Sequence, residues 1–489
     1  MTTPRVAILG GGISGLAVAY FLRKISKENN RLIEVRLFEG SPRAGGAIKT
    51  EIAEGFLLEK GPDAFITDKP WALALAKELG LENELISTQA VNRRSFIARN
   101  GKLLPVPEGF YLVAPLSVRA FLNSSIISWP GKLRMIAEPF LPKKSDDRDE
   151  SIASFVRRRF GSEALERVAQ AMIGGIYTGD PEVLSLRASM PRFFELEQKY
   201  GSLIRGLQIE VKSKKNPFAQ ASGPRYSLFA SFRQGMSVFS DALVKSVPGN
   251  LIRTGFLAHG IDYEPRTRKW QVDFGEKGLK EFDAVCITLS AGRAALLLQK
   301  SLPDISKKLA NISYESVATV NLAYKREQIS HSLDGFGFVV PKSENKTVIA
   351  CSFSSQKFAG RAPEGHVLLR AFVGGAFGRE SFKRNDEELL SAVTSELKEY
   401  LGIHGNPVLT RLERYPDAMV QYRLGHTELV RDIRKDISLF PGLSLTGSSY
   451  DGVGIPDCVR AAEIEAQKIF QVIPESFNRE SNLGMIPDK

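Results

Sequence analysis

The feature that most constrains this chain is a glycine-rich turn directly after its first apolar segment. The run from Val6 to Leu9 predicts a buried strand, and it leads into a G-x-G-x-x-G pattern formed by Gly10, Gly12 and Gly15. The first glycine permits a tight turn, the second lets the backbone approach a pyrophosphate, and the third lets the next helix pack close to the strand. The N-terminus of that helix then faces the phosphate charge. The chain is therefore expected to open with a strand–turn–helix unit that binds a dinucleotide.

A second strand and an acidic residue support the same unit. Residues 32–38 predict a strand that ends at Glu39, about two dozen residues beyond Gly15. An acid at this spacing is expected to accept hydrogen bonds from ribose hydroxyls. A glycine turn without a ligand is the alternative, and the combination of strand, helix and acid argues against it. The expected contacts of this unit are Gly10, Gly11, Gly12, Ile13, Ser14, Gly15 and Glu39.

Two further glycine-rich stretches are expected to reach the same ligand. The first follows Glu39 and contains an Arg-x-Gly-Gly run at 43–46, where Arg43 offers a planar donor fork to a phosphate. A solvated surface arginine is the alternative for this side chain. The second stretch lies between a short apolar strand at 443–445 and a helical pattern at 457–470, so it brings backbone N–H groups and a helix N-terminus to one place. If both ends of the chain bind one ligand, the nucleotide-binding lobe is discontinuous in sequence.

An Arg-x-Gly-Gly run directly after the ribose acid resembles FAD-dependent amine oxidases, phytoene desaturases and protoporphyrinogen oxidases, and NAD dehydrogenases lack it. Longer runs narrow the resemblance to the oxygen-dependent protoporphyrinogen/coproporphyrinogen oxidase family of haem biosynthesis. The most particular runs are Gly-Ile-Tyr-Thr-Gly-Asp-Pro at 175–181 and Gln-Tyr-Arg-Leu-Gly-His at 421–426. The other runs that carry the resemblance lie at 61–65, 102–107, 129–134, 335–341 and 447–453.

The resemblance implies that the cofactor is FAD. In the family, the position of Leu257 supplies backbone to the adenine from a middle strand, and the C-terminal glycine-rich loop contacts the flavin. Beyond the first turn, the cofactor contacts that carry over to this chain are Gly40, Arg43, Gly45, Gly46, Ala47, Gly61, Pro62, Leu257, Ser448, Val453, Gly454 and Ile455.

The resemblance also implies the reaction. A porphyrinogen would be oxidised to the porphyrin in three two-electron steps, each passed to FAD, and O2 would reoxidise the flavin to give H2O2. Val339 and Phe372 align with residues that sandwich the macrocycle, and burial in an ordinary core is the alternative for both. Asp63 is the candidate catalytic residue: it either steers the pyrrole N–H groups or caps a helix. Loss of a hydride into a growing conjugated system needs little acid–base help, so no catalytic dyad is expected.

One departure from the family concerns the substrate's carboxylates. Many relatives carry an arginine directly before the position of Phe96, where it pairs with a propionate, but this chain has Ser95 there. Arg93 and Arg94 stand just upstream as candidate substrate-binding residues, and the alternation of a strand can send one of them to solvent. The choice between protoporphyrinogen IX, a dicarboxylate, and coproporphyrinogen III, a tetracarboxylate, therefore stays open, although the run at 61–65 is closer to the coproporphyrinogen-oxidising enzymes.

Composition limits the partners. The formal net charge is +11, with 66 basic and 55 acidic residues, but the basic residues are scattered without a recognition motif, so nucleic acid is excluded. An anionic tetrapyrrole handled at a membrane surface suits the basic surface better. The five histidines and three cysteines form no metal-binding or disulfide pattern, which indicates reduced thiols in a cytoplasmic protein.

No signal peptide precedes the first strand, and no segment is predicted to span a membrane. The expected location is cytoplasmic, compatible with peripheral contact at the inner face of the cell membrane. A homodimer and contacts with other haem-pathway enzymes are also compatible with the sequence.

The predicted fold class is α/β with α+β insertions: a discontinuous, Rossmann-like FAD-binding lobe, a helical lobe and a mixed-sheet substrate lobe. Strands at 335–340, 348–353 and 367–373 are expected to form one wall of the substrate cavity. Residues 103–141 resemble short helices broken by turns, and the apolar stripe after Ser162 predicts a helix whose stripe faces the core. The predicted lobes are FAD-binding at 1–90, 225–300 and 410–475, helical and membrane-facing at 91–205, substrate-binding at 206–224 and 301–409, and a tail at 476–489.

Two other classes of protein are the alternatives: another FAD oxidoreductase of the same superfamily, and a non-catalytic flavin-binding protein. An amine oxidase is expected to build an aromatic cage around the amine, and a carotenoid desaturase is not expected to carry the run at 175–181. A non-catalytic flavin-binding assembly protein would need no large apolar slot. The sequence therefore favours porphyrinogen oxidation over both.

Overall fold

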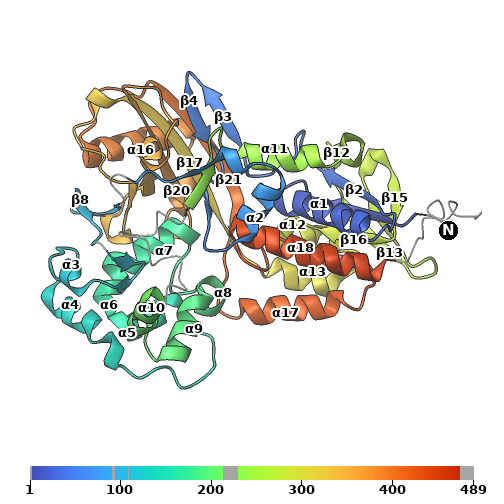
Figure 1. Cartoon of the computed structure of the whole chain (residues 1–489), viewed down its shortest axis with the longest axis horizontal. Coiled ribbons are helices and arrows are strands. Elements are labelled where there is room, and N and C mark those ends of the chain that lie inside the picture. The colour runs from blue at the N-terminus through green and yellow to red at the C-terminus, as the bar shows by residue number, and fades with distance from the viewer. Residues whose placement is uncertain (1–2, 91–93, 108, 213–228, 474–489) are drawn as a thin grey trace, which may run out of the picture.

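The structure is a computed structural model that describes residues 3–90, 94–107, 109–212 and 229–473. A five-stranded parallel sheet forms the centre of one of its lobes (Figure 1). The strand order is β12-β2-β1-β16-β22, and every neighbouring pair is parallel. The sheet draws on the start, the middle and the end of the chain, so the prediction of a discontinuous, Rossmann-like α/β lobe is confirmed. Its strands are β1 (Arg5–Leu9), β2 (Glu34–Glu39), β12 (Ile252–Thr254), β16 (Ala284–Ile287) and β22 (Leu443–Leu445).

Both faces of this sheet are covered, which explains why its strands are apolar throughout. Along β1, Val6 and Ile8 pack on one face, and Ala7 and Leu9 pack on the other. The first face is covered by α1 (Ile13–Glu28), α2 (Trp71–Glu78), α11 (Ser237–Ser246) and α18 (Ile455–Val472). The second face is covered by α12 (Ala291–Leu298), α13 (Pro303–Ala310), α17 (His426–Ile437) and a small sheet of β13 (Gly260–Glu264), β14 (Lys269–Asp273) and β15 (Leu279–Phe282).

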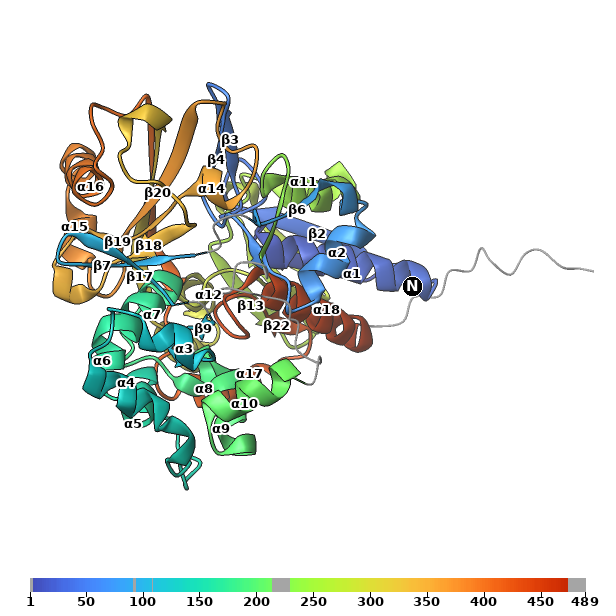
Figure 2. The same ribbon diagram turned by 60° about the vertical axis from the view of Figure 1, so that its left-hand side comes forward.

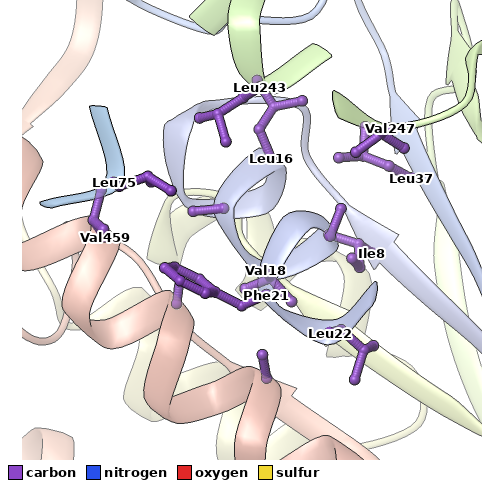
Figure 3. Packing of buried hydrophobic residues seen from close by; sticks show 14 of the residues in the cluster. Ile8, Leu16, Val18, Phe21, Leu22, Leu37, Leu75, Leu243, Val247 and Val459 are labelled. Carbon is purple, nitrogen blue, oxygen red and sulfur yellow. The ribbon is translucent and has the colours of Figure 1, made fainter. Parts of the chain in front are cut away.

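Helix α1 lies at the centre of the first face. Figure 3 shows its Leu16, Val18 and Phe21 among side chains from the sheet and from three other helices, with Val459 of α18 and Leu75 of α2 nearby. All of these residues are buried. The first and last helices of the chain therefore pack together and bring their N-termini to the same edge of the sheet.

A mixed seven-stranded sheet forms a second layer, in the order β21-β17-β20-β19-β18-β7-β8. Only the β18–β7 pair is parallel. Helix α16 (Asp386–Leu401) lies against one face, as Figure 2 shows, and its Leu389, Val393 and Leu397 are buried there. The strands are β7 (Phe96–Arg99), β8 (Lys102–Pro105), β17 (Tyr314–Lys325), β18 (Gly337–Val339), β19 (Val348–Ser352), β20 (His366–Gly374) and β21 (Leu409–Val420).

A group of short helices forms the third part of the molecule, below the mixed sheet in Figure 1. The helix predicted after Ser162 is confirmed, with a π-helical turn, η3 (Leu165–Ala169), between α6 (Ser162–Ala164) and α7 (Gln170–Tyr177). The other members are α3 (Val118–Leu122), α4 (Trp129–Ile136), η2 (Glu138–Phe140), α5 (Ile152–Phe160), α8 (Leu186–Ser189), α9 (Pro191–Tyr200) and α10 (Leu203–Lys212).

The stretch 103–141 differs from its prediction as broken helices. It opens with strands, because Pro105 closes β8 at the edge of the mixed sheet, where a missing N–H is tolerated. Short strands β9 (Phe110–Tyr111) and β10 (Ala114–Pro115) follow, and the helices begin only at Val118.

The lobe boundaries stay a prediction, and two details differ from them. Strands β7 and β8 extend the mixed sheet although they fall in the predicted helical lobe. Leu207 of α10 packs in the same cluster as α5 although residue 207 falls in the predicted substrate lobe, and residues 213–224 lie outside the described residues. Within the described part of the chain, no helix is both long and apolar enough to cross a membrane.

Candidate functional site

The two N-terminal glycine turns touch each other at the carboxyl edge of the parallel sheet. The N–H of Gly45 donates to the carbonyl of Gly11 at 2.7 Å. A Cβ on Gly15 would overlap the Gly10 carbonyl, and a Cβ on Gly46 would lie 2.9 Å from the Cα of Gly12, so both approaches require glycine. A Cβ on Gly12 would meet no atom within 4 Å. The side of the turn at Gly12 is therefore the open one.

Glu39 lies beside this turn, at the end of β2. One carboxylate oxygen accepts the N–H of Gly11 at 2.6 Å, and the other accepts the N–H of Ser41 at 2.8 Å. Leu257, which follows β12, lies next to Gly40: a Cβ there would be 3.0 Å from the Leu257 Cδ1 atom. The predicted adenine and ribose contacts therefore lie together, around a carboxylate that its own backbone holds in place.

The C-terminal glycine-rich loop reaches the same edge. A Cβ on Gly447 would lie 3.6 Å from the Ser14 hydroxyl oxygen, so the loop after β22 meets the first turn of α1. The helices α1 and α18 begin after Gly12 and Gly454, and neither has a side-chain cap. Uncapped N-termini leave backbone N–H groups for an anion. Ile13, Val453 and Ile455 belong to these two helix starts.

Arg43 differs in detail from its prediction. Its guanidinium donates to the carbonyls of Ala44, Gly46 and Ile48, at 2.9, 2.9 and 2.8 Å. The side chain therefore holds its own loop in shape, and its contact with a phosphate stays a prediction. Taken together, the open side at Gly12, the fixed carboxylate of Glu39 and the two uncapped helices fit an extended dinucleotide such as FAD.

One segment, Gly61–Asp63, connects this cradle to the mixed sheet. A Cβ on Gly61 would overlap the Ala47 carbonyl, so the segment, including Pro62, lies directly on the loop at 43–48. On its other side, Arg370 of β20 donates to the carbonyls of Lys60, at 3.1 Å, and of Gly61. Ser231 donates to the carbonyl of Asp63 at 2.8 Å. Asp63 is therefore held in place two residues along the chain from Gly61, which contacts the loop at 43–48.

A cavity of about 370 Å³ begins at Asp63. It lies between α7 and the mixed sheet, and it brings together three of the predicted residues: Asp63, Val339 and Phe372. Strands β18 and β19 form one wall, as the sequence predicted for this sheet. The remaining lining residues are Ser95, Val106, Phe110, Leu112, Met172, Gly175, Ile176, Phe229, Phe336, Gly337, Phe338, Ala350, Cys351, Ser352 and Lys357.

Asp63 and Lys357 both line this cavity and form an ion pair. Lys357 ends the short helix α14 (Ser354–Lys357), and its ammonium donates to an Asp63 carboxylate oxygen at 2.8 Å. Burial alone would raise the pKa of Asp63, but the charges of Lys357 and Arg370 outweigh it, and the pKa lies below its usual range. Asp63 caps no described helix, so the geometry favours its cavity role over the helix-cap alternative. It presents an ionised acceptor to whatever fills the space.

Of the two predicted arginines, Arg94 does not line this cavity. Arg94 pairs with Asp334 at 3.0 Å and is about half exposed, and Arg93 lies outside the described residues. Ser95 does line the cavity: it is only 5% exposed, and its hydroxyl has no hydrogen-bond partner among the described residues. Strand alternation therefore turns Ser95 inward and Arg94 outward.

The apolar residues at helical spacing after Ser162 are only partly buried in the hydrophobic core. Leu165 and Val168 are buried in the helical group, as predicted, but Met172 and Ile176 line the cavity, because Gly175 lets α7 come close to Val339. Helical spacing cannot distinguish a core face from a cavity face, since both are apolar. Lys357 was missed altogether, because a single lysine between two strands matches no motif.

A larger cavity of about 700 Å³ opens beyond β7 and contains none of the predicted site residues. Some of its charged side chains already have partners: Arg157 pairs with Glu182 at 2.5 Å, and Glu344 accepts the backbone N–H of Asn100 at 3.1 Å. The smaller cavity is the better candidate site, because it alone adjoins the cradle through Asp63.

Comparison with known proteins places this geometry in context. The model of the flavin-containing amine oxidoreductases matches residues 13–470. The chain is 33% identical to coproporphyrinogen III oxidase of Bacillus subtilis, over 93% of this chain and 95% of that one. It is 31% identical to the Staphylococcus aureus enzyme of the same name, over 96% and 99%, and 29% identical to chloroplastic protoporphyrinogen oxidase 1 of Spinacia oleracea, over 96% and 84%.

Solved structures agree with the sequence matches. A protein of Exiguobacterium sp. 255-15 assigned as a protoporphyrinogen oxidase superposes with a TM-score of 0.84 at 28% identity, over 96% of this chain and 99% of that one. Reduced UDP-galactopyranose mutase, at a TM-score of 0.71 and 14% identity, shares the fold.

Proposed function

The chain belongs to the flavin-containing amine oxidoreductase family, and from that membership we propose that it oxidises a porphyrinogen to the porphyrin in haem biosynthesis, with FAD as cofactor and O2 as acceptor. Porphyrinogen oxidation is the activity named for relatives that match this chain along nearly its whole length. The observation that carries the proposal is the segment Gly61–Asp63, which borders both the dinucleotide cradle and an apolar cavity. A flavin, when bound, accepts two electrons at a time and passes them to O2.

The chain's own residues bind and orient the substrate. Val339 and Phe372 offer apolar surface to a flat macrocycle, and α7 closes the opposite side through Met172 and Ile176. The Asp63 carboxylate, kept ionised by Lys357, accepts pyrrole N–H hydrogen bonds and holds one ring edge in register. The largely apolar wall excludes water and so strengthens that contact.

Lys357 is the cation available to a substrate carboxylate inside the described part of the cavity. Ser95 brings no charge to the cavity wall, and Arg93 and Arg94 stay candidates for a further contact with a substrate carboxylate. Coproporphyrinogen III is favoured as substrate, because the bacterial relatives named for it are 31–33% identical and the plant protoporphyrinogen oxidases 27–29%.

Steady-state assays with both porphyrinogens test the proposal directly. Porphyrin fluorescence should rise with either substrate while O2 is consumed and H2O2 appears, and kcat/KM should be higher for coproporphyrinogen III. Acid denaturation should release FAD, because the cradle contains no histidine and its one nearby cysteine, Cys458, is buried. Oxidation of an amine without oxidation of either porphyrinogen would contradict the assignment.

Peripheral membrane contact is part of the same proposal. The described helical group carries three strongly exposed apolar side chains: Trp129 at 63%, Leu133 at 65% and Phe140 at 84%. Trp129 and Leu133 lie one turn apart on α4, and Phe140 ends the neighbouring η2. Two exposed basic residues come from adjacent segments: Arg119 lies on α3, which contacts α4, and Lys143 follows Phe140 by three residues. An aromatic and apolar patch with basic neighbours suits the headgroup region of an anionic membrane.

A further inference from the structure

The run Gln-Tyr-Arg-Leu-Gly-His at 421–426 has no part in the cradle or the cavity, yet its tyrosine reaches the C-terminal glycine-rich loop. The Tyr422 hydroxyl donates to the carbonyl of Ser448 at 2.5 Å and accepts the N–H of Gly452 at 2.8 Å. One buried phenol therefore closes the loop 448–452 from both ends. Burial holds the pKa of Tyr422 well above its usual value, so the hydroxyl keeps the proton that it donates.

Backbone hydrogen bonds attach the segment around Tyr422 to the helical group. Its carbonyl accepts the N–H of Ser185 at 2.8 Å, and the N–H of Leu424 donates to the carbonyl of Val183 at 3.0 Å. The preceding Gln421 donates through its side-chain amide to the carbonyl of Tyr177, at the end of the cavity helix α7, at 3.0 Å. The two sequence runs that most distinguish this chain, 175–181 and 421–426, are therefore in direct contact.

The ring of Tyr422 is fixed as well. His426 stacks on it, with ring centroids 4.1 Å apart and an interplanar angle of 18°. Burial lowers the pKa of His426 to about 4, so the stacked imidazole is neutral near pH 7. The backbone and the ring of Tyr422 are therefore both held in place independently of the loop 448–452.

A second phenol supports the same loop. The Tyr314 hydroxyl lies 2.7 Å from the Ser449 hydroxyl and accepts the N–H of Ala291 at 2.7 Å. Tyr314 begins β17, and its register partner at the end of β21 is Val420, two residues before Tyr422. Both tyrosines therefore extend from the same end of the mixed sheet to successive residues of one loop.

We propose that Tyr422 is a positioning residue that holds the loop 448–452, and with it the N-terminus of α18, in place against the bound flavin. The inference rests on the proposed function, since the loop matters in this way only if the cofactor is a flavin. A glycine-rich loop of this length loses much conformational freedom when ordered, and a fixed bridge between its ends removes that cost before the cofactor binds. Backbone donors held in this way favour the more electron-rich form of the cofactor.

The test compares Tyr422→Phe with Tyr324→Phe in the flavin-loaded protein. Phenylalanine keeps the ring stacked on His426 and removes only the hydroxyl. Tyr324 is a matched control, because it is fully buried in β17 and its hydroxyl has no hydrogen-bond partner among the described residues. Three quantities are measured: the two-electron midpoint potential of the flavin, amide hydrogen exchange of the loop, and the kinetic constants.

Tyr422→Phe should weaken binding of reduced relative to oxidised flavin about tenfold, which lowers the midpoint potential by about 30 mV. The amide of Gly452 should exchange faster, and kcat should fall while the KM for the porphyrinogen is unchanged. Tyr324→Phe should match the wild type in all three. Wild-type potential and exchange in Tyr422→Phe would overturn the inference while leaving the proposed function intact. A wild-type protein that binds no flavin would overturn both.

Discussion

At the scale of single residues, the site depends on how burial and charge oppose each other at Asp63. Burial favours the protonated carboxyl, and the ammonium of Lys357 at 2.8 Å reverses that preference. The ionisation of Asp63, which the sequence analysis identified, is thus controlled by Lys357, which it did not identify. Asp63 alone would be a poor acceptor for pyrrole N–H groups, and the pair makes it an effective one.

Lys357→Met should therefore move the acid limb of the kcat/KM profile to higher pH. The lowered pKa of Asp63 keeps wild-type activity insensitive to pH above the ordinary aspartate range. Without the ammonium, only the nearby arginines oppose the effect of burial, and the pKa of Asp63 should rise. The profile is measured by porphyrin fluorescence between pH 5 and 9, with Lys346→Met, whose ammonium pairs with Glu399 outside the cavity, as control. An unshifted limb in Lys357→Met would show that Asp63 is not the titrating group.

His426 should make the stability of the protein depend on pH. Its pKa in the folded protein is about 4, below the unfolded value near 6.5. Between these two pH values the imidazole is largely protonated in the unfolded chain and largely neutral in the folded one. The free energy of unfolding should fall by up to about 3 kcal/mol as the pH drops from 6.5 to 4. His426→Phe, which retains the stack on Tyr422, should remove that part of the slope in urea titrations. A variant at an exposed position, His404→Gln, controls for loss of a histidine, and an equal slope in His426→Phe would contradict the assignment.

At the scale of elements, the turn between β1 and α1 separates two uses of glycine. Gly15 is required by the fold itself, because a Cβ would overlap the Gly10 carbonyl. Gly12 faces open space, where a Cβ is harmless to the apoprotein and would project toward a bound pyrophosphate. One turn therefore contains a glycine that the fold requires and, three residues earlier, a glycine that we propose faces the ligand.

Gly12→Ala and Gly15→Ala should accordingly have different effects. Gly12→Ala should leave the melting temperature of the apoprotein nearly unchanged and weaken FAD binding by roughly tenfold or more, since even a small displacement of the pyrophosphate breaks charge-assisted hydrogen bonds. Gly15→Ala should lower the melting temperature of the apoprotein itself. Differential scanning fluorimetry and flavin fluorescence titration measure both. Equal loss of stability in the two variants would mean that the open side at Gly12 is not the ligand side.

The elements also show how far sequence alone can go. The glycine turns, Glu39 and the strands of the mixed sheet could be predicted because their signals are local: spacing, alternation and turn chemistry. Lys357 could not be found, because its role arises only when α14 folds back toward Asp63, which is 294 residues away. Long-range contacts also explain two other differences. Pairing with β7 makes the segment ending at Pro105 a strand rather than a helix, and the approach of the mixed sheet makes Met172 a lining residue of the cavity.

At the scale of the whole molecule, the cradle, the mixed sheet and the helical group meet at the cavity and at Tyr422. The apolar patch of Trp129, Leu133 and Phe140 lies in the helical group, whose α7 forms one side of the cavity. Figure 2 shows α4 on the side of the molecule away from α1 and α18. A membrane contacted there would adjoin the substrate side of the molecule and leave the cofactor side in water.

The variant Trp129→Ser, Leu133→Ser, Phe140→Ser should therefore lose binding to anionic vesicles and retain activity in detergent-free buffer. Burying the three exposed apolar side chains together is worth on the order of a few kcal/mol. Cosedimentation with phosphatidylglycerol vesicles measures binding, and the matched control replaces exposed Leu279, Leu296 and Leu439, which lie outside the helical group, with serine. Equal cosedimentation of both triple variants and the wild type would place the contact elsewhere.

The discontinuous parallel sheet has a consequence for how the protein is made. More than 400 residues separate β1 from β22, so the ribosome finishes the last strand long after the first. At about 5–20 residues per second the interval is roughly 20–90 s. Throughout it, the apolar face of α1 that later packs on α18 has no partner, and the two helix starts that face the cofactor have not yet met. The two helix starts can therefore act together on a cofactor only after nearly the whole chain has been synthesised, because α18 is the last of the described helices.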